Sequence, residues 1–170
     1  SNATTGARIP KPADGCVASG AVDAPDLGFV DADCDGVDGS VARGIFVATS
    51  GDDDDPGTPQ KPVATLTRAL ALVKPGTRDQ IYVSKGGYDE SLTLVSGASI
   101  YGGYDDNQHW QRSRSNGTTI RGGTTAVTGR GLSGDLELQL LSIQAAPARD
   151  AAASSWSQRQ GRHCTPTPRP

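Results

Sequence analysis

Four short runs of β-forming residues decide the fold: Ile81-Tyr82-Val83, Ser99-Ile100-Tyr101, Thr119-Ile120-Arg121 and Leu141-Ser142-Ile143. Their isoleucines, Ile81, Ile100, Ile120 and Ile143, follow one another at intervals of 19, 20 and 23 residues. A sandwich of hairpins usually turns every ~8 to 12 residues. A recurrence of about 20 is typical of a solenoid whose coils each hold two or three short strands. We therefore expect stacked coils with like aliphatic side chains above one another.

Composition supports an all-β fold. Hydrophobic residues make up 35% of the chain and aromatic residues 5%, with 22 glycines and 11 prolines among 170 residues, which disfavours a helical bundle. Lesser β-type runs at residues 92–94, 126–128 and 136–138 lie between the main ones. No apolar run approaches the roughly 18 to 20 residues that a membrane-spanning helix needs, so we expect no membrane span.

One helix is expected. Val63, Leu66, Leu70 and Val73 recur at helical spacing, which predicts an amphipathic helix over residues 63–74, ended by Pro75-Gly76. It precedes the first main run, so we expect it to cap the N-terminal end of the coils. The four carboxylates of Asp52–Asp55 are expected to stay in water as a solvated loop.

The chain divides into four parts by composition. Residues 1–26 form an irregular arm that starts with Ser1-Asn2-Ala3, a sequence typical of a cleaved purification tag. Residues 27–44 are acidic, residues 45–144 form the β body, and residues 145–170 are an atypical tail. That tail is either a C-terminal cap, with a short helix over residues 150–159, or non-native sequence from a truncation or frame error. An uncovered end would expose unpaired strands and favour a homodimer.

The net charge and the cysteine content limit which partners and which cellular compartment we expect. The net charge is −3, with −8 in residues 1–60 and +5 in the remainder. The basic residues are dispersed, so we expect no nucleic-acid partner. Cys16 and Cys34 bracket a segment rich in proline, glycine and aspartate, which predicts a disulfide formed in an oxidising compartment. The alternative is two unpaired thiols, and Cys164 is the odd cysteine in either case.

The sharpest motif is Asp31-x-Asp33-x-Asp35-Gly36-x-Asp38-Gly39. Alternate aspartates followed by glycine let a tight loop aim three carboxylates at one centre, as calcium loops do. The motif predicts a structural calcium site whose ligands are Asp31, Asp33, Asp35, the carbonyl of Val37, and Asp38 or Asp26. Ala42 stands where an EF-hand has its bidentate glutamate, so no helix–loop–helix is implied. The alternative is an acidic turn whose side chains cap their own backbone.

Several motifs resemble the opening module of pectin-lyase-like right-handed parallel β-helix proteins. They are Ile45–Ala48, Gly51-x-Asp53-x-x-Pro56-Gly57-Thr58, Gly87-Tyr88-x-Glu90 and Ser99–Asp105 with Trp110 and Arg112. The acidic, cysteine-containing leader is also similar to that of uncharacterised bacterial cell-surface members of this group. The resemblance covers roughly residues 27–144. It implies a short right-handed parallel β-helix of about three coils and an extracellular address, with no settled activity.

A second group of residues combines chemistry that suits sugar contact: Asp105, Asp106, His109, Trp110 and Arg112. The alternative is an ordered loop in which Trp110 packs over a strand. No catalytic residues are predicted, because no acidic or basic group matches an active-site motif. We expect a non-catalytic secreted or surface module of adhesion or scaffold type, with an extracellular polysaccharide or cell-surface component as partner. The alternatives are the N-terminal part of a polysaccharide lyase or hydrolase, and a glycan-binding module.

Overall fold

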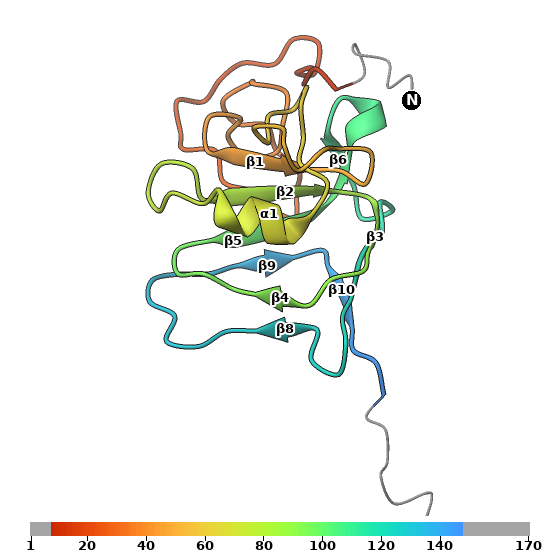
Figure 1. The fold of residues 1–170 in the computed structure, drawn as a ribbon. Coiled ribbons are helices and arrows are strands. Elements are labelled where there is room, and N and C mark those ends of the chain that lie inside the picture. The colour runs from red at the N-terminus through yellow and green to blue at the C-terminus, as the bar shows by residue number, and fades with distance from the viewer. Residues whose placement is uncertain (1–7, 148–170) are drawn as a thin grey trace, which may run out of the picture.

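The computed structural model describes residues 8–147, whose strands form three sheets (Figure 1). The first sheet contains β1 (Gly44–Val47), β2 (Gln80–Ser84), β5 (Ser99–Asp105) and β9 (Leu138–Gln139), all parallel, with β6 (Gln111–Arg112) antiparallel to β5. The second contains β3 (Gly86–Tyr88), β7 (Thr118–Arg121) and β10 (Ser142–Gln144). The third contains β4 (Leu92–Thr93) and β8 (Val127–Thr128). The prediction of an all-β chain with parallel strands is confirmed.

The chain visits the sheets in a repeated order. It runs through β2, β3 and β4, then through β5, β7 and β8, and then enters β9 and β10. Each pass therefore lays one strand on the corresponding strand of the pass before it, as the stacked arrows of Figure 1 show. Apart from β3 and β6, which no expected run covers, the short strands lie close to the runs expected from the sequence.

The predicted single row of isoleucines is wrong. Ile81 pairs with Ile100 in the first sheet, and the next residue in that row is Leu138. Ile120 lies in the second sheet, between Tyr88 and Ile143. The interval near 20 fails because residues 106–117 lengthen the second pass with the short helix η1 (Asp106–Gln108) and with β6. The step from Ile100 to Ile120 thus joins two different sheets, whereas the step from Ile120 to Ile143 joins neighbouring strands of the second sheet.

The space between the sheets holds an aliphatic core. Strand residues alternate between the two faces of a sheet, so β1 and β2 send Ile45, Val47, Ile81 and Val83 inward, all fully buried. They pack with Ile100 of the same sheet, with Leu92 and Ile120 of the other two sheets, and with Leu66 and Leu70 of the helix.

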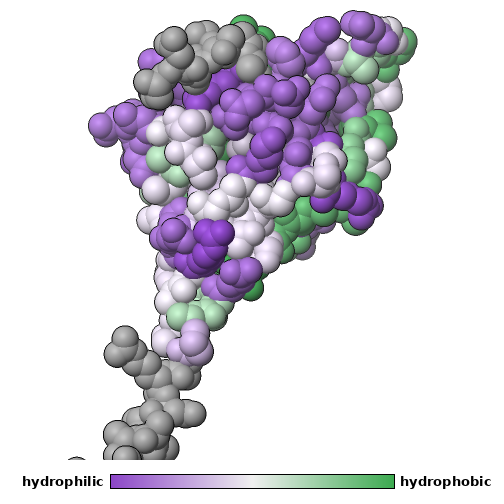
Figure 2. Space-filling view, turned by 90° about the vertical axis from the view of Figure 1, so that its right-hand side faces the viewer, coloured by the Kyte–Doolittle hydropathy of each residue, from purple (hydrophilic) through white to green (hydrophobic). Residues whose placement is uncertain are grey.

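The opposite face of the first sheet is buried too. Its register aligns Phe46 with Tyr82 and Tyr82 with Tyr101, and these rings form a second cluster with Tyr104 and Trp110. The irregular arm, residues 8–43, lies at the top of Figure 1, and its Val37 and Val41 pack in this cluster. In Figure 2 the upper part of the molecule is mainly hydrophilic. The arm therefore covers the aromatic cluster, and its own surface combines polar residues with exposed apolar ones such as Val17 and Val22.

The helix is shorter than the sequence predicts. α1 spans Leu66–Ala71, with Thr65 as N-cap, because Val63 forms a parallel bridge with Val47 in place of a helical turn. α1 contacts β1, β2 and β4. Neither α1 nor η1 has the length or apolar character to cross a membrane, and they are the helices found in residues 8–147.

Two carboxylates hold the start of α1. Asp53 accepts hydrogen bonds from the backbone N–H groups of Ala64 and Thr65, at 2.9 Å each, and from the Thr65 hydroxyl. Asp53 is therefore not a solvated residue of its acidic run, as predicted, but a structural one. Glu90, which follows β3, accepts from the N–H groups of Leu66 and Thr67, at 2.9 Å each. Carboxylates at these positions satisfy backbone donors that a helix leaves unpaired.

A buried ion pair ties the arm to the sheets. The Arg112 side chain is 0% exposed, and its Nη1 lies 2.8 Å from Oδ2 of Asp38, which is 3% exposed. Its Nε donates to the Gly102 carbonyl in β5, its Nη1 also to the Asp26 carbonyl, and its Nη2 to Gln139 Oε1 in β9. One guanidinium thus joins the arm to two strands of the first sheet.

We expect Arg112→Met to lower the free energy of unfolding by about 3–5 kcal/mol, because it leaves the Asp38 carboxylate buried without its cation. Arg121→Met is the control: its pair with Asp89 at 3.3 Å is exposed, so it should change stability by less than about 1 kcal/mol. Urea unfolding of both variants is the measurement. Similar losses in the two variants would contradict this role for Arg112.

We expect Glu90→Ala to destabilise the protein by about 2 kcal/mol, since two N–H groups at the start of α1 lose a charged acceptor. Its neighbour Asp89 is exposed and is a matched control, with an effect within about 0.5 kcal/mol for Asp89→Ala. Thermal unfolding followed by circular dichroism distinguishes the two. A Glu90 variant as stable as the Asp89 variant would show that the helix start does not depend on this carboxylate.

Candidate metal centre

The acidic segment folds as a tight loop. The two carboxylate oxygens of Asp31 accept hydrogen bonds from the N–H groups of Asp35 and Gly36, at 3.0 Å each, and Oδ1 of Asp33 accepts from Asp35 N–H at 3.1 Å. Gly36 has a φ of +97°, and a Cβ there would collide with the backbone of Lys11. The glycine of the motif is therefore required by both its conformation and its surroundings.

A disulfide joins the acidic loop to the preceding part of the arm. Cys16 and Cys34 are bonded, with their Cα atoms 5.9 Å apart, so the predicted pairing is confirmed. Next to it, the Ser19 N–H donates to the Ala32 carbonyl at 2.9 Å. These links bring the segment before residue 27 against the acidic loop.

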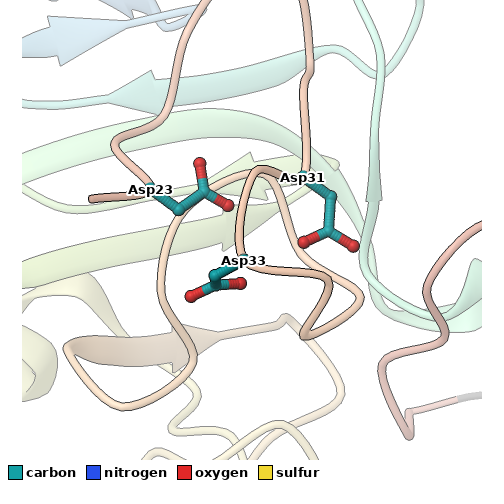
Figure 3. Close-up of side chains that lie close together, drawn as sticks. All are labelled: Asp23, Asp31 and Asp33. Atoms are coloured by element: carbon teal, nitrogen blue, oxygen red, sulfur yellow. The ribbon is translucent and has the colours of Figure 1, made fainter. Parts of the chain in front are cut away.

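Three carboxylates meet at this place: Asp23, Asp31 and Asp33 (Figure 3). Each offers an oxygen, and the three oxygens lie within 4.8 Å of one another. Two oxygen ligands on opposite sides of a calcium ion, each about 2.4 Å from it, are about 4.8 Å apart. Asp23 is buried, while Asp31 and Asp33 are half-buried. The spacing therefore fits one oxygen-liganded cation among the three side chains.

The other predicted carboxylate ligands, Asp35 and Asp38, do not belong to this cluster. Asp35 accepts from the N–H groups of Val37 at 3.1 Å and Val41 at 2.6 Å. Asp38 pairs with Arg112, and its Oδ1 accepts from the Asp26 N–H at 3.0 Å. Val37, which was predicted to supply its backbone carbonyl, is 1% exposed, and its side chain packs in the aromatic cluster. The structure thus brings together two of the predicted ligands, Asp31 and Asp33.

Sequence reasoning missed Asp23. It lies outside the alternating motif, and no spacing rule connects it with Asp31. Its Oδ2 accepts from the Ala32 N–H at 3.1 Å, a contact made when the chain folds back beside the disulfide. The one available signal was its position between the two bonded cysteines.

Burial sets the electrostatics of this region. Burial raises the pKa of Asp23, against the lowering effect of hydrogen bonds from Gly39 and Ala32. Burial also raises the pKa of Asp35 to about 6; the hydrogen bond from Val41 lowers it, and the charge of Asp33 raises it further. Neighbouring carboxylates that are costly to ionise gain from a cation, which favours their charged forms.

The predicted sugar-contact group is not a surface platform. Trp110 is 0% exposed; its Nε1 donates to the carbonyls of Arg8 and Pro59 at 3.1 Å each, and its ring meets Phe46 edge-on at 4.7 Å. A sugar cannot stack on a ring enclosed in this way. The sugar-contact prediction is therefore wrong for Trp110, and the alternative, a packed loop, describes it.

The remaining members of that group are also engaged. Asp105 pairs with Lys85 at 2.6 Å, and Asp106 accepts from the Ser84 hydroxyl at 2.7 Å; both carboxylates are buried. Arg112 belongs to the buried pair described above. His109 is half-buried, and its Nδ1 lies 2.8 Å from the Ile9 carbonyl. These side chains hold the 106–117 segment and the arm together.

We expect a pH dependence of stability to which Asp35 contributes. Its folded pKa of about 6 exceeds the ordinary value of 3.8, so between these values the folded chain binds more protons than the unfolded chain. Without divalent cations, the free energy of unfolding should therefore rise as the pH falls from about 7 to about 5. Urea unfolding in chelator at each pH measures this dependence. Asp35→Asn should show a smaller rise, and an unchanged pH profile in that variant would refute the assignment.

Comparison with known proteins identifies the chain at the family level. A search of curated proteins and a search of solved structures each found no match. One family profile, described as a protein of unknown function (DUF1565), matches residues 49–143, which is more than half of the chain. That family is associated with pectin-lyase-like β-helix proteins, in agreement with the parallel sheets. The chain belongs to the DUF1565 family.

Proposed function

We propose that the chain is a non-catalytic module of a secreted or cell-surface protein, built as a short right-handed parallel β-helix and stabilised by calcium. One observation carries the proposal: Asp23, Asp31 and Asp33 converge within 4.8 Å in the arm that covers the first sheet. A cation bound there would stabilise the covering layer of the fold. Its role would be structural, because the site lies in the arm and not in a groove of the sheets.

The β-helix interpretation is supported by the order of the sheets. β2, β3 and β4 correspond to one coil, β5, β7 and β8 to the next, and β9 with β10 to part of a third. Parallel in-register stacking of this kind is typical of solenoids. The family match covers these strands up to Ile143.

Calcium is proposed over other ions because of the ligand chemistry. All three side chains offer carboxylate oxygens, which suit a hard cation, and calcium takes six to eight oxygens in adaptable geometry. Three carboxylates leave room for water and backbone oxygens. Asp35, two residues from Asp33, adds negative charge beside the site.

An extracellular location is supported by the disulfide. Such bonds persist in oxidising compartments and are rare in the cytosol. The Cys16–Cys34 bond joins two parts of an arm that has no helix or strand before β1. An arm of this kind has little else to limit its unfolded conformations, so the bond has a clear stabilising role.

The non-catalytic assignment is supported by how the acidic groups are used. Among the described residues, Asp38, Asp79, Asp105 and Asp106 are buried carboxylates that bond to cations or hydroxyls. Groups bonded in this way position structure. An adhesion or scaffold role with an extracellular polysaccharide or surface component stays a prediction, as does pairing of two copies through an open end of the sheets.

The test is thermal unfolding after dialysis against chelator, with and without added calcium. At a calcium concentration of about 100 times Kd, linkage adds ~2.7 kcal/mol of stability, which for a domain of this size is a rise in Tm of roughly 5–10 °C. Asp31→Asn/Asp33→Asn should abolish the rise. The control Asp54→Asn/Asp135→Asn removes two exposed carboxylates and should keep it.

The outcomes separate the interpretations. A rise that is lost only in the Asp31/Asp33 variant supports a structural calcium site. No rise in the unaltered chain, or an equal rise in both variants, would reduce the acidic loop to a turn that caps its own backbone.

A further inference from the structure

Arg78 differs from the other enclosed arginines of the structure. Within residues 8–147, three other arginines are buried or half-buried, and each lies within 4.0 Å of a carboxylate: Arg8 with Asp106, Arg43 with Asp79, and Arg112 with Asp38. Arg78 is half-buried and forms no such pair with the described residues. Burial lowers its pKa. A partly enclosed cation with no counterion is an unfavourable arrangement that an anion would relieve.

The guanidinium of Arg78 is held in one orientation by neutral acceptors. Its Nε donates to the Gly44 carbonyl at 3.0 Å, and its Nη2 to the carbonyls of Pro56 at 2.7 Å and Gly57 at 2.6 Å. These contacts use Nε–H and both hydrogens of Nη2, and leave the two hydrogens of Nη1. Arg78 therefore presents one fixed nitrogen as a charged donor.

That side chain lines a pocket of about 430 Å³ between the arm, β1 and the loop before α1. The volume is in the range of small-molecule sites. Pro10, Val41 and Pro59 supply apolar surface, and Thr58 and Gln60 supply polar groups. A mostly apolar lining with one fixed charged donor suits an organic anion.

Asp35 lies in the wall of the same pocket and limits the charge of the ligand. Both of its oxygens accept backbone N–H groups, and it does not pair with Arg78. A second negative charge on a ligand would lie near this carboxylate, which disfavours a dianion such as phosphate.

We propose that this pocket binds a small organic monocarboxylate, with the carboxylate at Nη1 of Arg78 and the apolar part against Pro10, Val41 and Pro59. Hydrogen bonds from a guanidinium to a carboxylate are among the strong ones in proteins. Asp23, Asp31 and Asp33 do not line this pocket, so the proposal does not depend on calcium binding.

The experiment is an NMR titration of the ¹⁵N-labelled chain with benzoate, at fixed ionic strength and fixed calcium. Benzyl alcohol, which has a ring and no charge, and inorganic phosphate are titrated in parallel. We expect saturable shifts of the Ala42, Gly44 and Gln60 amides with benzoate, with a Kd on the order of 1 mM, and no saturation with the other two.

Two variants and one control locate the binding. Arg78→Gln should weaken benzoate binding at least about tenfold. Because Arg78 also holds three carbonyls, Ala42→Phe provides a second route: it fills the pocket from an exposed position and should weaken binding to a similar extent. Arg68→Gln removes an exposed arginine of α1 and should leave the Kd unchanged.

Three results would overturn the proposal. The first is no saturable benzoate binding by the unaltered chain. The second is equal binding of benzoate with benzyl alcohol or with phosphate. The third is a Kd unchanged by Ala42→Phe or by a folded Arg78→Gln variant.

Discussion

The parallel register of β1, β2 and β5 is the constraint on which the structure depends. Pairing Ile45 with Ile81 and Ile81 with Ile100 places the next residues, Phe46, Tyr82 and Tyr101, in one row on the opposite face. An inward aliphatic row thus requires an outward aromatic row. Large rings in water would be an exposed apolar patch, so the first sheet needs a cover. The arm provides it, and the sheet is buried on both faces.

A cover without helices or strands must be held by other means. The Cys16–Cys34 bond closes it on itself, and the buried pair of Arg112 with Asp38 fixes it to the sheet. The hydroxyl of Tyr104 adds a hydrogen bond to the Asp38 carbonyl. The acidic cluster lies in the arm, so a cation bound there would stabilise the segment that shields the aromatic row from water. The pocket beside Arg78 lies at the margin of the layer, where the arm meets β1.

The parts of the candidate site that short-range sequence patterns encode could be predicted. The Asp31–Gly36 motif and the cysteine pair are short-range patterns, and both lie where the sequence indicated. Asp23 was not predictable, because the fold-back of the arm brings it to the site. Asp35 and Asp38 belong to the motif but not to the cluster, and Asp38 pairs with Arg112 instead. Trp110 resembled a binding residue because exposed and buried tryptophans are identical in sequence.

The sequence by itself determined the class of the fold, the positions of most short strands, the turn at Gly36 and the disulfide, since each depends on neighbouring residues or on composition. Tertiary structure decided which strands pair, since the 106–117 segment separates Ile100 from its partner Leu138. It also decided where α1 begins, because Val63 is taken by β1 and because Asp53 and Glu90 bind the first free N–H groups. Strands and hydrogen-bonding groups that are distant in the sequence compete for the same partners. The outcome of that competition is visible only in the folded chain.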